Sequence, residues 1–254
     1  MKCKLNGKLL KDKMESILLK GKWNNGGNNK NTTLCPSIVI SVDKESMVCS
    51  LLNADPSTYV KNSMGLLEFD DTESGRICID TEILLKYLPK EDCIFKLENN
   101  ILQLLTDRKS VKIPILARHE NNDSIMFVEK NLTLSRNITD VFSVSNKTVL
   151  KTKVKVSSEE LANAFADCEA VGNSVFKLDY DGNDLIVSSS KDNENVSVHI
   201  YVAEGLGEKA TMEFSCPFHK YLEGRLTILS FNDESPLAVV SGDYRVLRAP
   251  RIEN

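Results

Sequence analysis

The chain has 254 residues, of which 41% are hydrophobic and 27% charged, and its formal net charge is -4. These values are typical of a globular protein with a proper core, built as one large or two ordinary domains. The sequence contains no run of about 18 apolar residues, so we predict no membrane-spanning helix.

The charge is unevenly distributed along the chain. The first 22 residues carry seven lysines against Asp12 and Glu15, a net charge of +5, which leaves -9 for the rest. A protein that is acidic overall can still hold a polyanion if its positive groups share one face. The same acidic residues interrupt any apolar signal core, so we expect an intracellular protein.

The seven cysteines predict no metal site and no disulfide framework. Their number is odd, no Cys-x-x-Cys occurs, and no His is spaced to join them as a ligand. We interpret them as reduced core residues, in keeping with an intracellular compartment. The cysteines are at positions 3, 35, 49, 78, 93, 168 and 216.

The first half reads as helix, strands, helix, strands. Residues 8–20 have a helical apolar stripe, and the polar stretch "WNNGGNNKNTT" after them predicts a flexible loop. Residues 37–69 predict three strands separated by turns. "SGRICID" predicts a further strand, after which Asp80 or Thr81 caps a helix that stops at Pro89. Three more strands follow, the first two joined through Asn99-Asn100.

The segment 117–148 interrupts this pattern. It is polar and rich in Asn, with one short apolar run at Ile125, Met126, Phe127 and Val128. We interpret it as a connector that crosses the surface.

The second half repeats the first. "VLKTKVKV" predicts a strand, Ser157 or Ser158 caps a helix with Leu161 and Phe165 on its apolar face, and Gly172 ends it. "SVFKLDYDGNDLIVSSS" predicts a hairpin, "VSVHIYV" a strand and "ATMEFSCPFHKYLEG" a strand and short helix. This order indicates an internal duplication.

The closing stretch, residues 225–254, predicts two strands joined by a polar turn and a third short strand. Pro236 opens the second strand and the chain ends on "APRIEN". This ending resembles the C-terminus of the proliferating cell nuclear antigen (PCNA) family of DNA sliding clamps. In that family a proline opens the penultimate strand, and an Ala-Pro-Lys-Ile-like tail borders the pocket for client proteins.

Other stretches resemble the same family in the same order, over nearly the whole chain. In the first domain, the two helices correspond to "GKLLKDKMESILL" and "ICIDTEILLKYL", with "SLLNADPSTYV" between them. The entry to the connecting loop corresponds to "VKIPIL". In the second domain, the helix, glycine and hairpin correspond to "KVKVSSEELANAFADCEAVGNSVFKLDYDGNDLIVSSS", and the strand before the last helix corresponds to "MEFSCPFHKYL".

The resemblance implies an α+β DNA clamp fold with two similar domains, each with antiparallel sheets outside and two helices on the inner face. We expect an N-terminal clamp domain at 1–116, an interdomain connecting loop at 117–148 and a C-terminal clamp domain at 149–254. Family subunits form a ring whose sheets continue across subunit boundaries. By analogy, the strands near 99–107 of one subunit and 171–187 of the next would meet.

The resemblance also implies a DNA polymerase processivity factor with no catalytic activity, cofactor or metal. Its partners would be double-stranded DNA of any sequence, and a DNA polymerase, clamp loader, nuclease and ligase that bind through short peptide motifs. We expect a homotrimer, with a heterotrimer as the alternative, in the nucleus or viral replication site of a eukaryotic system or in archaeal cytoplasm.

The positions that match the family's DNA-facing helices carry lysines, which bind phosphates as hydrated point charges without reading bases. The predicted DNA-binding residues are Lys8, Lys11, Lys13, Lys20, Lys86, Lys90 and Lys220. The second-domain helix departs from the pattern, because Asn163 and Ala166 occupy its matching positions among four acidic residues. The second domain is therefore expected to hold DNA weakly.

Client peptides with a glutamine and two aromatics would bind between the connector and the tail. The predicted client-peptide residues are Thr58, Tyr59, Ile125, Met126, Phe127, Val128, Pro236, Leu247, Ala249, Pro250 and Ile252. Met126 and Phe127 could equally anchor the connector to the sheet.

The sequence offers three alternatives to a processivity factor. An enzyme is disfavoured, because His119, His199 and His219 are scattered and no nucleophile or phosphate-loop motif occurs. Five Asn-x-Ser/Thr triplets would suit a secreted β-rich binding module. The third alternative is a checkpoint-type or viral transcription-associated clamp homologue in a mixed ring, which would have the same fold and a different function.

Overall fold

The computed structural model divides the chain into two compact units. Unit 1 is Met1–Asp55 with Tyr59–Met126, and unit 2 is Pro56–Thr58 with Phe127–Asn254. The structure describes residues 1–25, 28–33, 37–70, 74–116, 120–145, 148–172, 175–215 and 218–251.

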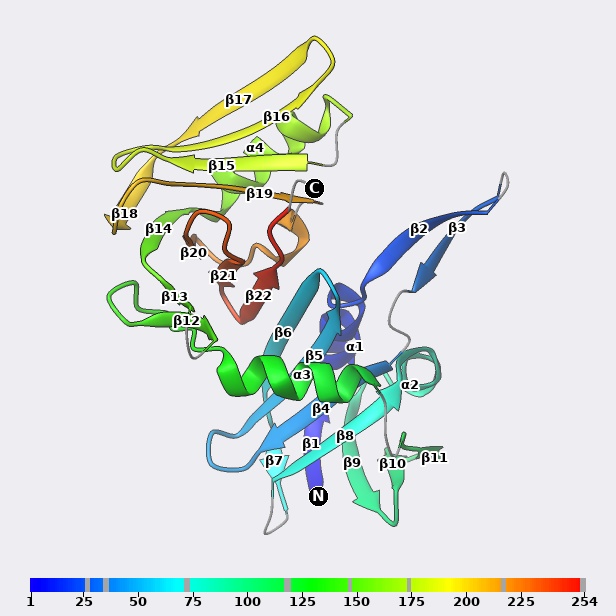
Figure 1. The fold of residues 1–254 in the computed structure, drawn as a ribbon. Coiled ribbons are helices and arrows are strands. Elements are labelled where there is room, and N and C mark those ends of the chain that lie inside the picture. Colours follow the sequence, from blue (N-terminus) through cyan, green and yellow to red (C-terminus); the bar gives the residue numbers. More distant parts are fainter. Residues whose placement is uncertain are drawn as a thin grey trace. The chain divides into compact units, whose positions relative to one another are not determined.

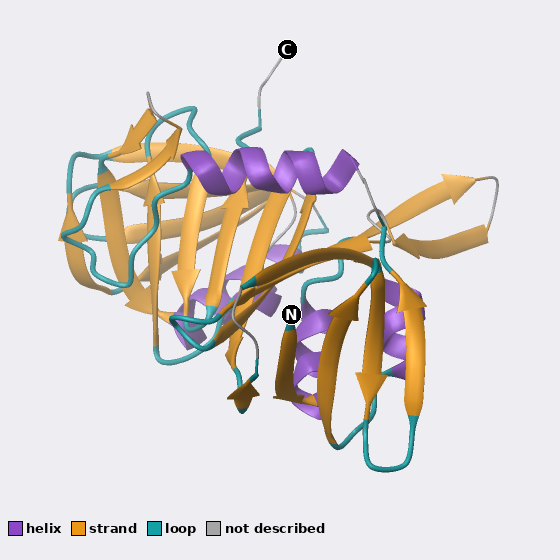
Figure 2. Ribbon diagram, turned by 90° about the horizontal axis from the view of Figure 1, so that it is seen from below, coloured by secondary structure: helices purple, strands orange, loops and turns teal. Residues whose placement is uncertain are grey.

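Unit 1 contains the helices α1 (Gly7–Ser16) and α2 (Thr81–Tyr87), which lie beside each other against the strands (Figures 1 and 2). One sheet has the order β11-β10-β9-β1-β7 and another β6-β5-β4-β8, and β2 and β3 pair separately. The strands are β1 (Lys2–Asn6), β2 (Lys20–Asn25), β3 (Asn28–Thr33), β4 (Ser37–Asp43), β5 (Val48–Asp55), β6 (Thr58–Gly65), β7 (Glu68–Phe69), β8 (Gly75–Asp80), β9 (Asp92–Glu98), β10 (Ile101–Leu105) and β11 (Ser110–Pro114).

Unit 2 contains α4 (Ser158–Glu169), which packs on β14, β16 and β17, and the 3₁₀ turn η1 (His219–Tyr221). Its strands follow the orders β18-β14-β20-β21-β22 and β17-β16-β15-β19. They are β14 (Thr152–Ser157), β15 (Val175–Tyr180), β16 (Leu185–Lys191), β17 (Glu194–Ile200), β18 (Val202–Leu206), β19 (Ala210–Ser215), β20 (Leu226–Phe231), β21 (Leu237–Ser241) and β22 (Tyr244–Arg248).

The two units have the same topology, which confirms the predicted duplication. In chain order β1, β7, β9, β10 and β11 correspond to β14, β18, β20, β21 and β22, and each set forms a sheet in the same order. The repeat extends to side chains. Lys4 pairs across the strands with Glu68 at 3.5 Å, and the equivalent Lys155 pairs with Glu204 at 3.5 Å.

In each unit one strand, β1 or β14, runs directly into a capped helix. The Asn6 side chain accepts a hydrogen bond from the Leu9 amide at 2.8 Å, and Ser157 accepts one from the Glu160 amide at 3.3 Å. Asp80 caps α2 as predicted. These side chains satisfy amide groups that have no partner within the helix.

The core of unit 2 is an aromatic cluster between α4 and the sheet. Phe165 on α4 lies 4.7 Å from Phe218 and 5.6 Å from Phe176 between ring centroids, both edge to face. Such contacts add to the free energy gained from burying the rings. The predicted apolar residues of this helix, Leu161 and Phe165, are fully buried, and so is Cys168.

The connector contains more regular structure than its sequence predicts. Residues 120–131 form the helix α3 (Glu120–Asn131), and β12 (Phe142–Ser145) pairs with β13 (Thr148–Leu150). Ile138, Phe142 and Leu150 pack on Ile228 and Val240 of unit 2. The segment 132–150 is thus anchored by an apolar cluster.

Three further expectations were wrong. The first helix ends at Ser16 rather than near residue 20, and the stretch expected as a loop pairs as β2 and β3 with Lys22 opposite Asn31. The strands expected to meet a second subunit are interior. β10 is hydrogen-bonded to β9 and β11, and β15 to β16 and β19, so neither has an open edge.

The described cysteines are buried thiols, as predicted: Cys3, Cys49, Cys78, Cys93 and Cys168. Cys35 and Cys216 lie outside the described residues. Burial raises the pKa of Cys3 to about 11 and that of Cys93 to about 12, and it also raises the pKa of Cys49.

These thiols predict a loss of stability at alkaline pH. Because their folded pKa values are raised, their contribution is complete below the usual thiol value of 9.0 and is lost as pH rises toward 11 and 12. Above pH 9 each thiol should lower the free energy of unfolding by about 1.4 kcal/mol per pH unit. Urea unfolding between pH 8 and 10 measures this slope, which Cys3→Ala should reduce. An equal slope in the variant contradicts the assignment.

Candidate nucleic-acid interface and client groove

The lysines of unit 1 gather where α1 meets the loop after α2. A Cβ atom at Gly7 would lie 2.4 Å from the Pro89 carbonyl oxygen and 2.5 Å from that of Glu91, so only glycine fits there. The Gly7 amide donates to the Glu91 carbonyl at 3.2 Å. This backbone contact brings Lys8 and Lys90 into the same neighbourhood.

Most of the predicted lysines are accessible in the structure. Lys8, Lys86 and Lys90 are exposed. Lys11 is half-buried, with its Nζ 4.0 Å from a carboxylate oxygen of Glu15. Such an exposed ion pair contributes little to stability, so the ammonium group remains usable for a ligand.

Lys13 does not reach the surface, contrary to its predicted role. It is 8% exposed, and its Nζ donates to the Asn62 side-chain oxygen at 3.0 Å. Its position in α1 is three residues after Leu10 and one before Met14, which places it within the buried stripe of the helix. Lys13 therefore links α1 to β6, and its ammonium group is buried where DNA would not reach it.

Lys20 lies in β2 rather than in the first helix, and its side chain lies outside the described residues.

The structure adds a cation that sequence reasoning missed. Lys109, in the turn before β11, has its Nζ 5.4 Å from the Tyr87 ring centroid, and Lys86 approaches the same ring at 5.3 Å. No sequence signal joins these two lysines, because only tertiary packing brings them to one ring.

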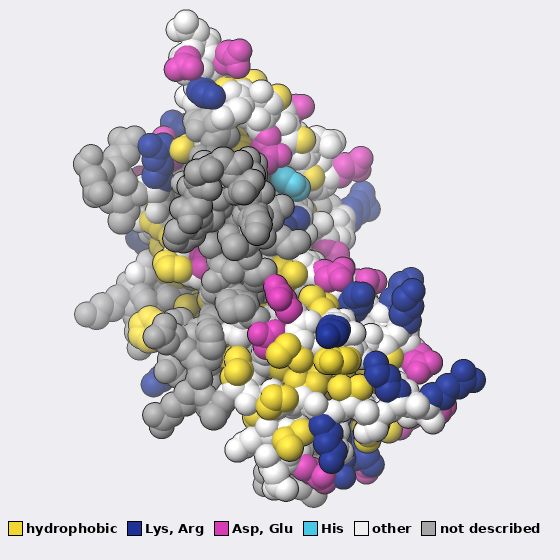
Figure 3. Space-filling model, turned by 90° about the vertical axis from the view of Figure 1, so that its right-hand side faces the viewer, with side chains coloured by type: hydrophobic (Ala, Val, Ile, Leu, Met, Phe, Trp, Pro, Cys, Tyr) yellow, Lys and Arg dark blue, Asp and Glu magenta, His cyan; other side chains and the backbone are white. Residues whose placement is uncertain are grey.

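Figure 3 shows the side of the molecule that carries α2 and β11. In the lower part of this view, Lys and Arg side chains gather around a group of hydrophobic ones. Ile83 on α2 and Ile101 on β10 are 42% and 36% exposed. This face of unit 1 combines positive charge with exposed apolar surface.

The helix α4 of unit 2 carries negative charge, in contrast to the lysines on the helices of unit 1. The exposed acidic residues of α4 are Glu159, Glu160, Asp167 and Glu169. Lys220 is exposed on η1, with its Nζ 4.7 Å from the Tyr221 ring centroid. The His219 ring lies 4.0 Å from the Glu169 carboxylate.

Part of the predicted client groove is brought together at one end of the β21–β22 hairpin. Leu237 pairs with Arg248, which places Pro236 beside Ala249. The Ala249 amide donates to the Ser57 carbonyl at 2.9 Å. Thr58 is buried and accepts a hydrogen bond from the Arg248 guanidinium group.

The other predicted client residues differ in exposure. Phe127 and Met126 on α3 are 72% and 51% exposed, whereas Ile125 is buried and Val128 half-buried. Tyr59 is also buried, so its ring presents no open surface. Leu247 and Pro250 are half-buried, and Ile252 lies outside the described residues.

The segment 132–150 is held by a buried lysine. Lys153 on β14 is 8% exposed, and its Nζ donates to the Ile138 carbonyl at 2.8 Å and to the Asp140 carbonyl. The same ammonium group lies 5.1 Å from the Phe142 ring centroid. Burial lowers the pKa of Lys153, and the Asp140 carboxylate acts in the opposite direction.

In the described ranges, no three His, Cys, Asp or Glu side chains are grouped so that they could hold a metal ion. Nor does any helix within those ranges have the length and apolar character needed to cross a membrane.

Comparison with known proteins gives a structural likeness only. No family model and no curated protein matches the sequence. The solved structure of A. fulgidus PCNA bound to the C-terminal region of FEN-1 is similar, with a TM-score of 0.67 and 15% identity over 100% of this chain and 99% of that one. A chain of the PCNA2–PCNA3 complex from Sulfolobus tokodaii has a TM-score of 0.64 and 12% identity, over 100% of this chain and 100% of that one.

Bacterial clamps are also similar. The DNA polymerase III beta subunit of Thermotoga maritima has a TM-score of 0.72 and 14% identity, and this chain spans 66% of its length. The chain therefore has the DNA sliding-clamp fold. Its full-length correspondence is with the PCNA subunit.

The Lys153 anchor can be tested by Lys153→Met, which keeps the aliphatic stem and removes the donors. Leaving the buried Ile138 carbonyl and the partly buried Asp140 carbonyl without this donor should lower the free energy of unfolding by about 1–3 kcal/mol. Hydrogen exchange in 132–150 should accelerate. Lys155→Met on the same strand removes only an exposed ion pair and should cost less than about 1 kcal/mol. Equal effects of the two changes on stability and exchange would contradict the anchor.

Proposed function

We propose that the chain is a subunit of a ring-shaped DNA sliding clamp that acts as a polymerase processivity factor. The observation that carries this proposal is the duplicated unit, with two sheets in the same strand order and a full-length match to PCNA subunits. Such a protein performs no catalysis. It tethers an enzyme topologically, so that release requires the ring to open rather than a few ion pairs to break.

Duplex DNA would be held through the helix layer of unit 1. Lys8, Lys11, Lys86 and Lys90, with Lys109 nearby, supply flexible cations for phosphate groups. Contacts of this kind position a duplex without reading its sequence, as sliding requires. Lys220 is the corresponding candidate in unit 2.

Ring closure would join an edge strand of unit 1 to one of unit 2 in a second copy. β11 and β17 are edges of their sheets in the described structure, and each presents backbone groups able to pair. Their charges are complementary. Arg108, Lys109 and Lys112 are exposed at β11, and Asp192 and Glu194 at β17. A head-to-tail joint of this kind closes into a ring, for which we propose three subunits.

Client enzymes would bind through short peptide motifs. The similar A. fulgidus PCNA carries the FEN-1 C-terminal region, which supports this for the present chain. Exposed Phe127 and Met126, with Pro236, Ala249 and Pro250, are the proposed apolar contacts.

A mixed ring is a second candidate, favoured by the acidic surface of α4. A partner chain with a basic helix layer would supply the positive charge that unit 2 lacks. The PCNA2–PCNA3 complex is an example of two different clamp chains together.

The DNA assignment predicts the effect of Lys11→Ala with Lys86→Ala. Removing two phosphate contacts should weaken polymerase stimulation, lower its salt tolerance and reduce the salt slope of DNA binding by about 2. Lys44→Ala with Lys151→Ala, two exposed lysines elsewhere, is the matched control. Unchanged stimulation at every salt concentration would exclude these lysines as DNA contacts.

The client assignment predicts that Phe127→Ala with Pro250→Ala abolishes binding of a peptide that contains a glutamine and two aromatics. The changes remove an exposed ring and a half-buried proline, both outside the core, so the melting temperature should stay unchanged. Calorimetric titration measures the affinity, and Val141→Ala, at another exposed apolar position of the connector, should bind normally. Full affinity in the double variant refutes the assignment.

A further inference from the structure

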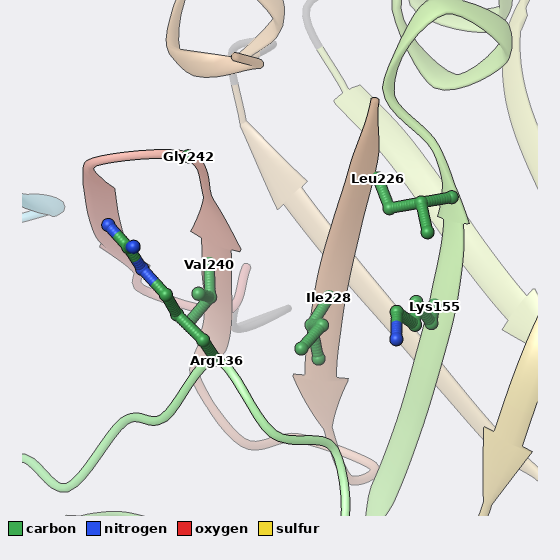
Figure 4. Close-up of a pocket in the computed structure, with 6 residues that line it drawn as sticks. All are labelled: Arg136, Lys155, Leu226, Ile228, Val240 and Gly242. Carbon is green, nitrogen blue, oxygen red and sulfur yellow. The ribbon is translucent and has the colours of Figure 1, made fainter. Parts of the chain in front are cut away.

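Two cations of unit 2, Arg136 and Lys155, line the pocket shown in Figure 4 and are balanced within the protein. Arg136 donates to the Asp243 carboxylate at 2.8 Å, and Lys155 lies 3.5 Å from the Glu204 carboxylate. A different group of lysines contacts tyrosine rings, and this contact recurs in both units.

The sequence Lys-Tyr-Leu occurs once in each unit, at 86–88 and at 220–222. The first copy lies at the end of α2 and the second in η1. α2 follows β8 and η1 follows β19, and these strands hold the same place in the orders β6-β5-β4-β8 and β17-β16-β15-β19. The two copies are therefore equivalent in the duplicated topology.

Each copy makes the same contact. The Lys86 Nζ lies 5.3 Å from the Tyr87 ring centroid, and the Lys220 Nζ lies 4.7 Å from that of Tyr221. At distances of up to about 6 Å an aromatic ring attracts a cation. Both lysines are exposed, whereas Tyr87 is half-buried and Tyr221 is buried. Each ring is thus fixed by the fold and holds an ammonium group at the surface.

Unit 1 brings a second lysine to its ring. The Lys109 Nζ lies 5.4 Å from the Tyr87 centroid. The turn that carries Lys109 is fixed, because its amide donates to the Thr106 hydroxyl at 3.1 Å and its carbonyl accepts from the Thr106 amide at 2.9 Å. Within the part of the chain that the structure describes, Lys86 and Lys109 form no ion pair. Two like charges at one ring repel each other, and an anion that reaches both would offset the repulsion.

The duplication keeps this contact although the charge of the neighbouring helix is reversed. α1 carries Lys8 and Lys11, whereas the corresponding α4 carries Glu159 and Glu160. A lysine held on a ring at equivalent places of both units therefore indicates a task that the units share. In the proposed clamp, that task is contact with the phosphates of a duplex.

We propose that Tyr87 and Tyr221 are positioning residues for DNA phosphates. Each ring holds a lysine where a phosphate can meet it, and Tyr87 joins Lys86 and Lys109 into a two-lysine site. A lysine held in this way has less side-chain entropy to lose on binding, so its contact is stronger. The proposal rests on the sliding-clamp function and adds to it two uncharged residues and a lysine from a strand turn.

The test uses the full chain and a short blunt DNA duplex, titrated at several salt concentrations and followed by the NMR signals of the lysine side chains. Tyr87→Leu should weaken binding about two- to five-fold, the effect of losing an exposed cation–π contact. The salt slope should stay the same, because both charges remain. Tyr87→Phe, which keeps the ring, should restore the affinity. The ring-current shifts of the Lys86 and Lys109 signals should be lost in Tyr87→Leu only.

The lysines are tested separately. Lys109→Met and Lys220→Met should each reduce the salt slope by about 1, and Lys44→Met, at an exposed lysine before β5, is the matched control. In a background with Lys86→Met and Lys109→Met, Tyr87→Leu should have no further effect, because the ring acts only through these lysines. The lysine variants change exposed side chains, so they remain informative if Tyr87→Leu does not fold.

The proposal is overturned if Tyr87→Leu binds the duplex as tightly as the wild type, or more tightly because the ring competes with phosphate. A further loss in the background without the two lysines assigns Tyr87 a structural role, and an unchanged salt slope in Lys109→Met excludes that lysine. Polymerase stimulation is measured in parallel. A wild-type chain that binds the duplex as described without stimulating a polymerase supports the site and contradicts the processivity function. A chain that binds no duplex contradicts both.

Discussion

Both units depend on a strand that enters a capped helix without a linker. Leu5 and Val156 are buried on the strands, Asn6 and Ser157 cap the helices, and the helices begin at the next residue. With no linker, each helix must cover the sheet face to which the buried strand residues point. The neighbouring Lys4 and Lys155 then occupy the other face, where both form the same cross-strand ion pair.

The parts of the fold with regular apolar patterns could be predicted from the sequence. Local sequence patterns predicted the alternating strands, the helix caps Asp80 and Ser157 and the Asn99-Asn100 turn. Both of these asparagines have the left-handed backbone that such a turn needs. No local pattern predicted helix α3. Its apolar residues are consecutive rather than spaced by three or four, and asparagine is a poor helix former.

The sites were less predictable because they depend on burial and on tertiary neighbours. Lys13 could have been recognised as buried, since it shares the helical spacing of Leu10 and Met14. The acceptor of its hydrogen bond, Asn62, could not have been predicted, because Asn62 lies on β6 and only tertiary packing brings it to Lys13. The hydrogen bond from Arg136 to Asp243 likewise arises from packing of the connector on the sheet.

The duplication preserves the topology and not the charge. Unit 1 presents lysines on its helices, and unit 2 presents the acidic surface of α4. Long-range repulsion between α4 and phosphates would weaken the grip on DNA at low salt and be screened at high salt. In the proposed ring, retention on DNA would therefore depend mainly on topology, and electrostatic attraction would be secondary.

Topological retention can be measured directly on linear duplex DNA. The protein is allowed to thread onto free ends, both ends are then blocked with streptavidin, and the complex is washed at high salt. A ring should resist the wash when both ends are blocked and slide off when they are free. Equal loss from blocked and free DNA would contradict the claim that this chain forms a ring around a duplex.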